Sequence, residues 1–446
     1  MELRFTDDRI QPMNASTDTP PMTVGEHLQT RIPVAPVAIA VIGLLAALLN
    51  PVQPVTEGRV SSTNPVLLLK LATAASAWVI TVWSLLRSHA TRQTIATTVG
   101  IALATLSATM LVAGILSPTS SRLISVAAAL ILIGYLGFVT ASLSAIGFGT
   151  LARALVLGLA MYLGIAWLIY LLFPSFGEFH EYVDATTTVA RMGGVAHPNA
   201  IAHEASTAVL LVIASLFGTT AIDFKNDSQV QSRWRLFDSA VLCLAAATLV
   251  ATLSRTAVLA TVIASAMILF DRLYSRKGML LANLGLIAAL AAFLVYGLAS
   301  GKSPLDSAVS KVTKSGNVEE LTSLTGRTRI WQEALTLIGE RWWIGYGMDS
   351  AATVMSPESV GTHNLMFHIL FSGGIVAGGI VVMLLLITLQ IAIRSPQPLF
   401  RGIATYVLVS GLVEDTILPA FPASLTMLWM AMLLLHSQTR SRLPTV

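Results

Sequence analysis

Isolated arginines lie among apolar residues at two places in the chain. Arg191 opens the run RMGGVAHPNAIAHE, which also contains Asn199 and His203, and Arg255 lies in the short run TLSRT between two apolar stretches. A guanidinium group stays charged at physiological pH and binds phosphate through paired hydrogen bonds. Both arginines are therefore candidates for an anion site. For Arg255 the alternative is an anchor in the lipid headgroup region.

The adjacent residues His203 and Glu204 suggest a metal site, because HExxH on a helix is a zinc-protease signature. Thr207 occupies the position of the second histidine, so the signature is incomplete. The sequence also contains no GxSxG elbow and no Walker-type phosphate loop. We therefore predict no metal and no cofactor. For His203 and Glu204 the alternative to a functional role is a hydrogen-bond network between helices.

A longer group of polar motifs begins at residue 326. It comprises Gly326-Arg327-Thr328-Arg329, Gly345-Tyr346-Gly347, Thr362-His363-Asn364, and Gly373-Gly374 within an apolar stretch. A histidine has an ordinary pKa of about 6.5, so His363 is suited to accept the proton of a hydroxyl group. Asn364 could orient this histidine or cap the helix that follows. Glu414 and Asp415 lie near the same face and could pair with an arginine or serve as the base instead.

Aromatic residues accompany these motifs, namely Trp331, Trp342, Trp343 and Tyr346. Aromatic rings stack on sugars, but Trp and Tyr also collect at the membrane–water boundary. The boundary interpretation is favoured, because two adjacent tryptophans directly follow the helical pattern of residues 327–338.

The elements that must position these residues are transmembrane helices. The chain is 54% hydrophobic and 11% charged, whereas a soluble domain carries roughly 25% charged residues. Apolar runs near the length of about 20 residues that a spanning helix needs recur along the chain. We predict an all-α polytopic membrane protein with about twelve spans, at residues 33–50, 65–86, 93–116, 123–147, 151–173, 195–221, 236–252, 256–270, 279–300, 364–390, 398–417 and 423–437.

The basic residues predict how these spans are oriented. Outside the long segment 301–362, Lys and Arg are concentrated in connections that would share one side with the N-terminus, and basic connections face the cytoplasm. Both termini are then cytoplasmic, with tails at residues 1–32 and 438–446. Nine spans occupy residues 33–300 and three occupy 363–437. The segment 301–362 is a partly helical periplasmic loop.

Charge and cysteine content exclude further classes of protein. The net charge is +4, but the basic residues are scattered singly and form no patch for nucleic acid. Cys243 is the single cysteine, which excludes a disulfide within the chain and a cysteine-based metal site.

The order and spacing of the motifs from Gly326 to Gly374 resemble the O-antigen ligase and polymerase family of bacterial envelope glycan assembly. That family shares G-R-x-x-x-W, then G-x-G, then H-N before an apolar helix that contains a small-residue turn. Arg191-Met192-Gly193-Gly194 with Pro198-Asn199, and Ser254-Arg255, are similar to further elements of the family. The rest of the chain is matched by hydropathy and topology.

The resemblance implies a GT-C-like fold in the bacterial inner membrane and a metal-independent transfer reaction. A glycan carried on undecaprenyl pyrophosphate would pass to an acceptor hydroxyl, on another glycan or on a lipid A core, at the periplasmic face. It implies that Arg191, Arg255 and Arg327 hold the pyrophosphate, with Arg329 as a close substitute for Arg327. His363 would be the base, and Asn199 and Asn364 would contact the substrate.

Two other functions compete with this interpretation. A transporter or flippase would use Lys70, Glu204 and Asp238 as charges within the membrane, but no internal repeat of the kind common in transporters is visible. A non-enzymatic scaffold would not require arginines and histidines to collect on one face.

Overall fold

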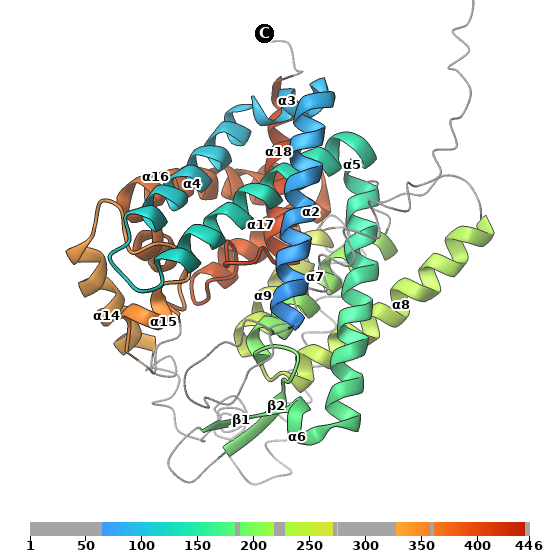
Figure 1. Ribbon diagram of the computed structural model, residues 1–446. Helices are drawn as coiled ribbons and strands as arrows, with labels where there is room; N and C mark the ends of the chain where they lie inside the picture. Colours follow the sequence, from blue (N-terminus) through green and yellow to red (C-terminus); the bar gives the residue numbers. More distant parts are fainter. Residues whose placement is uncertain are drawn as a thin grey trace, which may run out of the picture.

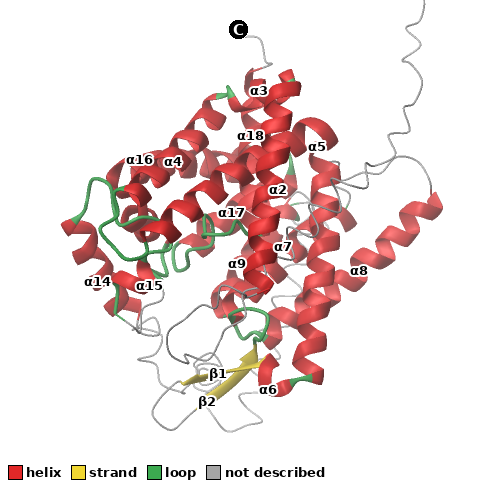
Figure 2. Ribbon diagram, in the orientation of Figure 1, coloured by secondary structure: helices red, strands yellow, loops and turns green. Residues whose placement is uncertain are grey.

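The computed structural model describes residues 65–182, 188–217, 228–270, 274, 327–356 and 361–441. These residues form a bundle of helices with one two-stranded hairpin at one end (Figures 1 and 2). The elements are α2 (Pro65–Arg87), α3 (His89–Ile95), α4 (Thr98–Ile115), α5 (Arg122–Leu172), α6 (Pro174–Gly177), β1 (Glu178–Tyr182), β2 (Thr188–Met192), α7 (Pro198–Leu216), α8 (Ser228–Ala251), α9 (Arg255–Ile268), α14 (Arg327–Glu340), α15 (Ala351–Val354), α16 (Leu365–Arg394), α17 (Pro398–Gly411) and α18 (Ser424–Ser441).

Within the described ranges, 6 helices are long and apolar enough to cross a membrane. These are α2, α4, α5, α7, α8 and α16. The expectation of a helical polytopic membrane protein is therefore confirmed at this level. The predicted spans 33–50 and 279–300, and residues 301–326 of the predicted loop, lie outside the described residues.

Helix α5 covers two predicted spans, 123–147 and 151–173, without a loop between them. Gly147 has φ of 74° and ψ of 167°, so the helix bends there and its two arms run in different directions (Figure 1). Glycine permits this left-handed geometry because it lacks a Cβ atom. The bend lets one continuous helix pack against α2 and α4 with its first arm and against α7 and α8 with its second.

Two of the predicted spans are short helices in the structure. The predicted span 398–417 is α17, which ends at Gly411, because the chain turns there to bring Glu414 and Asp415 out of the helix. Helix α9 has 14 residues and is likewise short. At 1.5 Å per residue, such helices are shorter than a hydrocarbon core of about 30 Å.

Residues 174–194, which connect the predicted spans 151–173 and 195–221, contain structure that the sequence did not indicate. Its ends form the antiparallel strands β1 and β2, in which Phe179 pairs with Arg191 and Glu181 pairs with Val189. Glu181 and Arg191 are diagonal neighbours, and such neighbours on one face can interact. The hairpin therefore brings an acidic side chain to one of the candidate arginines.

A glycine-rich junction joins α14 to α16. At Gly374 the φ of 65° interrupts α16 and leaves the carbonyl groups of the preceding turn without helical partners. The amides of Tyr346 and Gly347 donate to Phe371 O and Ser372 O at 2.8 and 2.9 Å. The paired glycine motifs of the sequence are therefore one structural unit, which orients α14 against the start of α16.

Candidate active site

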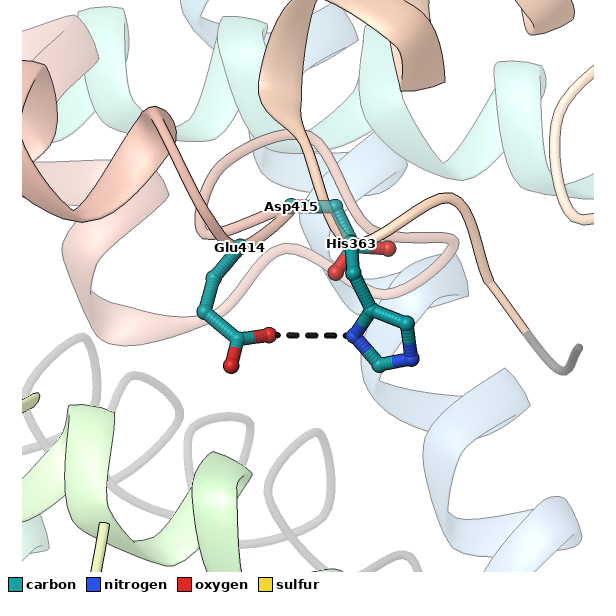
Figure 3. A group of neighbouring side chains, drawn as sticks. All are labelled: His363, Glu414 and Asp415. Carbon is teal, nitrogen blue, oxygen red and sulfur yellow. Dashed lines mark hydrogen bonds and ion pairs between the residues drawn. The ribbon is translucent and has the colours of Figure 1, made fainter. Parts of the chain in front are cut away.

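Glu414 lies at the centre of a hydrogen-bonded group assembled from four parts of the chain. Its Oε1 atom accepts hydrogen bonds from Arg327 Nη2 and, at 3.1 Å, from Asn199 Nδ2. Its Oε2 atom lies 3.2 Å from His363 Nδ1 (Figure 3). Only 5% of the Glu414 side chain is exposed. A buried carboxylate with partners on both oxygens is a fixed negative charge that positions its neighbours.

The protonation of Glu414 and His363 follows from these contacts. Burial acts to raise the pKa of the Glu414 carboxyl, but the hydrogen bond with His363 and the charge of Arg327 outweigh burial and lower this pKa to about 2. The hydrogen bond with Glu414 raises the pKa of His363 above its ordinary value, against the opposing effect of burial. Glu414 is thus ionised at neutral pH and is a weak base, whereas His363 is the stronger base of the two.

His363 lies directly before α16 in a conformation that few side chains adopt. Its φ is 47°, in the left-handed region, where a residue other than glycine is strained. Nδ1 faces Glu414, and Figure 3 shows the second ring nitrogen, Nε2, turned away from that carboxylate. The side chain is 31% exposed, so Nε2 is the nitrogen available to a ligand.

Asn364 caps α16, which is one of the two roles expected for it. Its Oδ1 accepts from the amide of Phe367 at 3.1 Å, and its Nδ2 donates to Leu412 O at 2.7 Å. The second bond ties the start of α16 to the segment that carries Glu414. Asn364 therefore fixes the segment that carries His363 against the segment that carries Glu414.

Arg327 is the first residue of α14 and bonds to the Glu414 segment twice. Nη1 donates to Val413 O and Nη2 donates to Glu414 Oε1. A guanidinium has five N–H donors, so these two bonds leave capacity for a ligand. Arg329, on the same helix, is exposed. Pairing of Glu414 with an arginine was one of the two roles considered for this carboxylate.

Arg191 is 3% exposed and is held by three parts of the protein. Its guanidinium donates to Glu181 Oε2 at 2.6 Å, Thr252 O at 2.7 Å and Asn199 Oδ1 at 2.8 Å. Asn199 in turn donates a hydrogen bond to Glu414. The α7 helix begins at Pro198 with His197 as its cap, which places Asn199 in the first turn, beside β2.

Arg255 begins α9, directly after the turn between α8 and α9 that supplies Thr252 O to Arg191. The structure therefore brings the segments of Arg191, Arg255 and Arg327 to one end of the bundle.

Glu181 is the functional candidate that sequence reasoning missed. No pattern around Glu181 indicated its role, because its contact with Arg191 depends on the register of the hairpin.

His363, Glu414 and Asp415 could also be considered as metal ligands. One ligand atom from each lies within 4.8 Å of the others. However, both Glu414 oxygens already have protein partners, and the guanidinium of Arg327 would repel a cation. The group therefore fits a hydrogen-bonded site better than a metal site.

The three charged residues that a transporter would use differ in the groups that contact them. Asp238 pairs with Arg153 and accepts from Ser215 Oγ at 2.6 Å, and Glu204 accepts a hydrogen bond from Ser424. Both carboxylates therefore have partners inside the protein. Lys70 is also buried, beside the ring of Phe421.

Comparison with known proteins identifies the family of the segment that carries most of these residues. A search of curated proteins gave no match. Residues 240–387 match the family model described as O-Antigen ligase. This segment includes Arg255, Arg327 and His363, whereas Arg191 and Glu414 lie outside it. The match over residues 240–387 supports an assignment to the O-antigen ligase family.

Proposed function

We propose that this protein transfers a glycan from undecaprenyl pyrophosphate to an acceptor hydroxyl at the periplasmic face of the bacterial inner membrane. It acts as a polysaccharide polymerase or as an O-antigen ligase. The family match and the apolar helices support a membrane enzyme of this class. The observation that carries the proposal is the meeting of Arg327, His363 and Glu414, which come from three separate segments.

In the proposed reaction, His363 Nε2 accepts the proton of the acceptor hydroxyl. The hydroxyl oxygen forms a bond to the anomeric carbon of the donor, and the bond from that carbon to the pyrophosphate oxygen breaks. The pyrophosphate leaves with the bonding electrons, so a single displacement inverts the anomeric configuration. Glu414 orients His363 and stabilises its protonated form, as the carboxylate does in other histidine–carboxylate pairs.

The leaving pyrophosphate needs positive charge in place of a metal ion. Arg327 and Arg255 supply it, with Arg329 exposed on the same helix as Arg327 and Arg191 anchoring the surrounding segments. Preorganised charges of this kind stabilise charge that develops in the transition state. Asn199 and Asn364 complete the site by holding Glu414 and the start of α16.

The test is transfer by the purified protein supplied with an undecaprenyl-pyrophosphate glycan and either a second lipid-linked glycan or a lipid A core. Release of undecaprenyl pyrophosphate and extension of one acceptor are expected. His363→Ala should lower kcat by about 10²–10⁴-fold, the range typical of a general base. Full transfer by properly folded Arg255→Ala, Arg327→Ala and His363→Ala variants would refute these assignments.

Two controls address the alternatives. Excess chelator should leave the transfer rate unchanged, and a loss restored by added zinc would support a metal mechanism instead. A transporter would move the lipid-linked glycan across a vesicle membrane without releasing undecaprenyl pyrophosphate. That result would replace the proposed function.

A further inference from the structure

A buried lysine near the candidate active site makes no direct ion pair with any residue that the structure describes. Lys70 of α2 is 6% exposed, and its Nζ atom lies 5.0 Å from the centre of the Phe421 ring. Within the described ranges, its amine makes no hydrogen bond and no ion pair within 4.0 Å. An ammonium group removed from water without a counter-charge in direct contact is unfavourable. Lys70 is therefore suited to a ligand that brings a negative charge.

Asp349 lies within electrostatic reach of Lys70, and His368 and Asp415 lie within electrostatic reach of Asp349. We call these four residues the Lys70 cluster. Asp349 is the carboxylate that acts electrostatically on Lys70. His368 Nδ1 lies 4.0 Å from Asp415 Oδ2, and its Nε2 lies 3.3 Å from Leu418 O. The cluster draws on α2, α16 and two loops, so only the folded chain assembles it.

The backbone around the Lys70 cluster is strained in a way typical of functional sites. Asp349 and Leu418 have φ of 57° and 64°, and each is a residue that rarely adopts these values. Asp349 is accessible to solvent, yet enclosure by its surroundings raises the pKa of its carboxyl. Its side chain is thus held in place but remains reachable by a ligand.

The Lys70 cluster is continuous with the site of the proposed reaction. Asp415 belongs both to the cluster and to the group in which ligand atoms of His363, Glu414 and Asp415 lie within 4.8 Å of one another (Figure 3). Arg327 contacts the Oε1 atom of Glu414, whereas His363 contacts Oε2. Arg327 bonds to Val413 and Glu414 and to no residue of the Lys70 cluster, so a pyrophosphate held by Arg327 need not occupy this cluster. In a single displacement the acceptor must approach opposite the leaving group.

We propose that the Lys70 cluster is the acceptor subsite, and that it binds a sugar bearing an anionic group. Lys70 pairs with the carboxylate or phosphate of that sugar. Asp349 and Asp415 accept hydrogen bonds from its hydroxyl groups, and Asp415 brings the bound sugar next to His363. This inference rests on the proposed glycosyl transfer, because it assigns one of the two substrates of that reaction.

The experiment measures binding without turnover, using the full chain in lipid nanodiscs. Methyl glucoside, methyl glucuronide and methyl glucoside 6-phosphate are the sugar probes, and farnesyl pyrophosphate is the probe for the donor site. Both anionic sugars should bind at least about tenfold more tightly than the neutral one, the effect of one charge-assisted hydrogen bond. Preference for only one of them would identify the anion as carboxylate or phosphate.

Variants separate the two subsites. Lys70→Met keeps the volume of the side chain and should abolish the preference for anionic sugars, while Lys70→Arg should retain it. Farnesyl pyrophosphate binding should be unchanged in Lys70→Met and weakened in Arg327→Gln. Equal binding of all three sugars by the natural protein, or unchanged preference in Lys70→Met, would overturn the inference.

A loss of farnesyl pyrophosphate binding in Lys70→Met as large as in Arg327→Gln would also overturn it, because Lys70 would then belong to the donor site. The outcome for the proposed function is read separately from the transfer assay. If the protein transfers the glycan but binds anionic and neutral sugars equally, only the assignment of the acceptor subsite is wrong. Anionic preference without transfer defeats the proposed function.

Discussion

The carboxylate of Glu414 connects residues that differ in charge and in their positions along the chain. It accepts from Arg327 and Asn199 on one oxygen and contacts His363 with the other. Removing one partner of a buried ionic group costs more than a surface ion pair contributes, because the remaining charge loses its solvation. Glu414 is therefore expected to affect both the stability of the site and the proton affinity of His363.

The pH dependence of transfer tests this coupling. His363 must be neutral to accept a proton, and its hydrogen bond with Glu414 raises its pKa. The kcat should therefore rise with pH, with a midpoint above the ordinary value of about 6.5. Glu414→Gln removes the negative charge, so the midpoint should move to lower pH.

Asp415→Asn is the matched control for this measurement, because Asp415 also acts on His363 but does not hydrogen-bond to it. Its midpoint should move less than that of Glu414→Gln. An identical midpoint in the natural protein and in Glu414→Gln would contradict the role of the pair.

At the scale of elements, the junction between α14 and α16 decides where Arg327 and His363 lie relative to each other. Backbone amides of residues 346 and 347 bond to carbonyls of α16 beside the interruption at Gly374. A Cβ atom on Gly374 would lie 2.2 Å from Trp343 O, and one on Gly345 would lie 2.5 Å from Phe371 O. The motif therefore requires glycine for close approach of two backbones as well as for its φ values.

Replacing Gly374 with alanine should shift α14 away from α16. Strain in the left-handed conformation alone is about 1–2 kcal/mol, and the overlap with Trp343 O adds to it. We expect a lower Tm and a loss of transfer in Gly374→Ala. Gly379→Ala on the same helix is the control, because its Cβ would meet no atom within 4 Å. Equal stability of the two variants would rule out this account of the motif.

Arg191 links β1, α7 and the hairpin between α8 and α9 through one planar group. Arg191→Lys keeps the charge but cannot reproduce the geometry of three hydrogen bonds. The expected destabilisation is about 3 kcal/mol, the scale for disrupting a buried pair, and it should appear as a lower Tm in detergent. Arg122→Lys, at an exposed position at the start of α5, should leave Tm unchanged. An unchanged Tm in Arg191→Lys would show that the three hydrogen bonds do not organise the site.

At the scale of the whole molecule, the two ends of the bundle carry different polar groups. The candidate site, α6 and the hairpin lie toward one end, and α3 lies at the other (Figure 1). The buried pair of Arg153 and Asp238 lies far from Arg191, since Asp238 precedes Thr252 by roughly 20 Å along α8. The buried pair of Arg153 and Asp238 and the charges of the candidate site are thus spatially separated.

The pair of Arg153 and Asp238 should therefore influence stability without altering the reaction. Arg153→Met leaves Asp238 buried without its partner and should lower the stability by about 3–5 kcal/mol, whereas the double variant Arg153→Met/Asp238→Leu should recover most of it. The transfer rate per folded molecule should be unchanged in the double variant. A double variant no more stable than Arg153→Met would contradict the prediction.

The predicted orientation of the bundle can be tested by labelling. Cys243 is the single cysteine of the chain, so Cys243→Ser provides a cysteine-free background. A membrane-impermeant maleimide should label His180→Cys in the hairpin of intact spheroplasts, but Gln93→Cys in α3 only after permeabilisation. Both positions are exposed. The reverse pattern would place the candidate site in the cytoplasm.

Sequence alone indicates candidate site residues where a residue type limits its own role. Isolated arginines and a histidine before an apolar helix could be recognised as candidates because few environments in a membrane protein accept them. The centrality of Glu414 could not be recognised, because its partners are far away along the chain and pairing with an arginine and service as the base were equally open. The strands of the hairpin were missed because strand pairing depends on register and not on hydropathy. At residue 147 the sequence predicted the end of one span, whereas the structure has one continuous helix that bends at Gly147.

Sequence by itself determined that this chain is a helical membrane protein with an O-antigen ligase motif, because apolar run length and motif spacing are local properties. Only the tertiary structure decided that Arg191 is held by Glu181, that Arg327 and His363 share Glu414, and that Lys70 is buried without a direct ion pair among the described residues. These outcomes depend on strand register, helix bends and helix packing, which bring distant residues within hydrogen-bond distance. Such contacts arise from the whole fold, and no short segment encodes them.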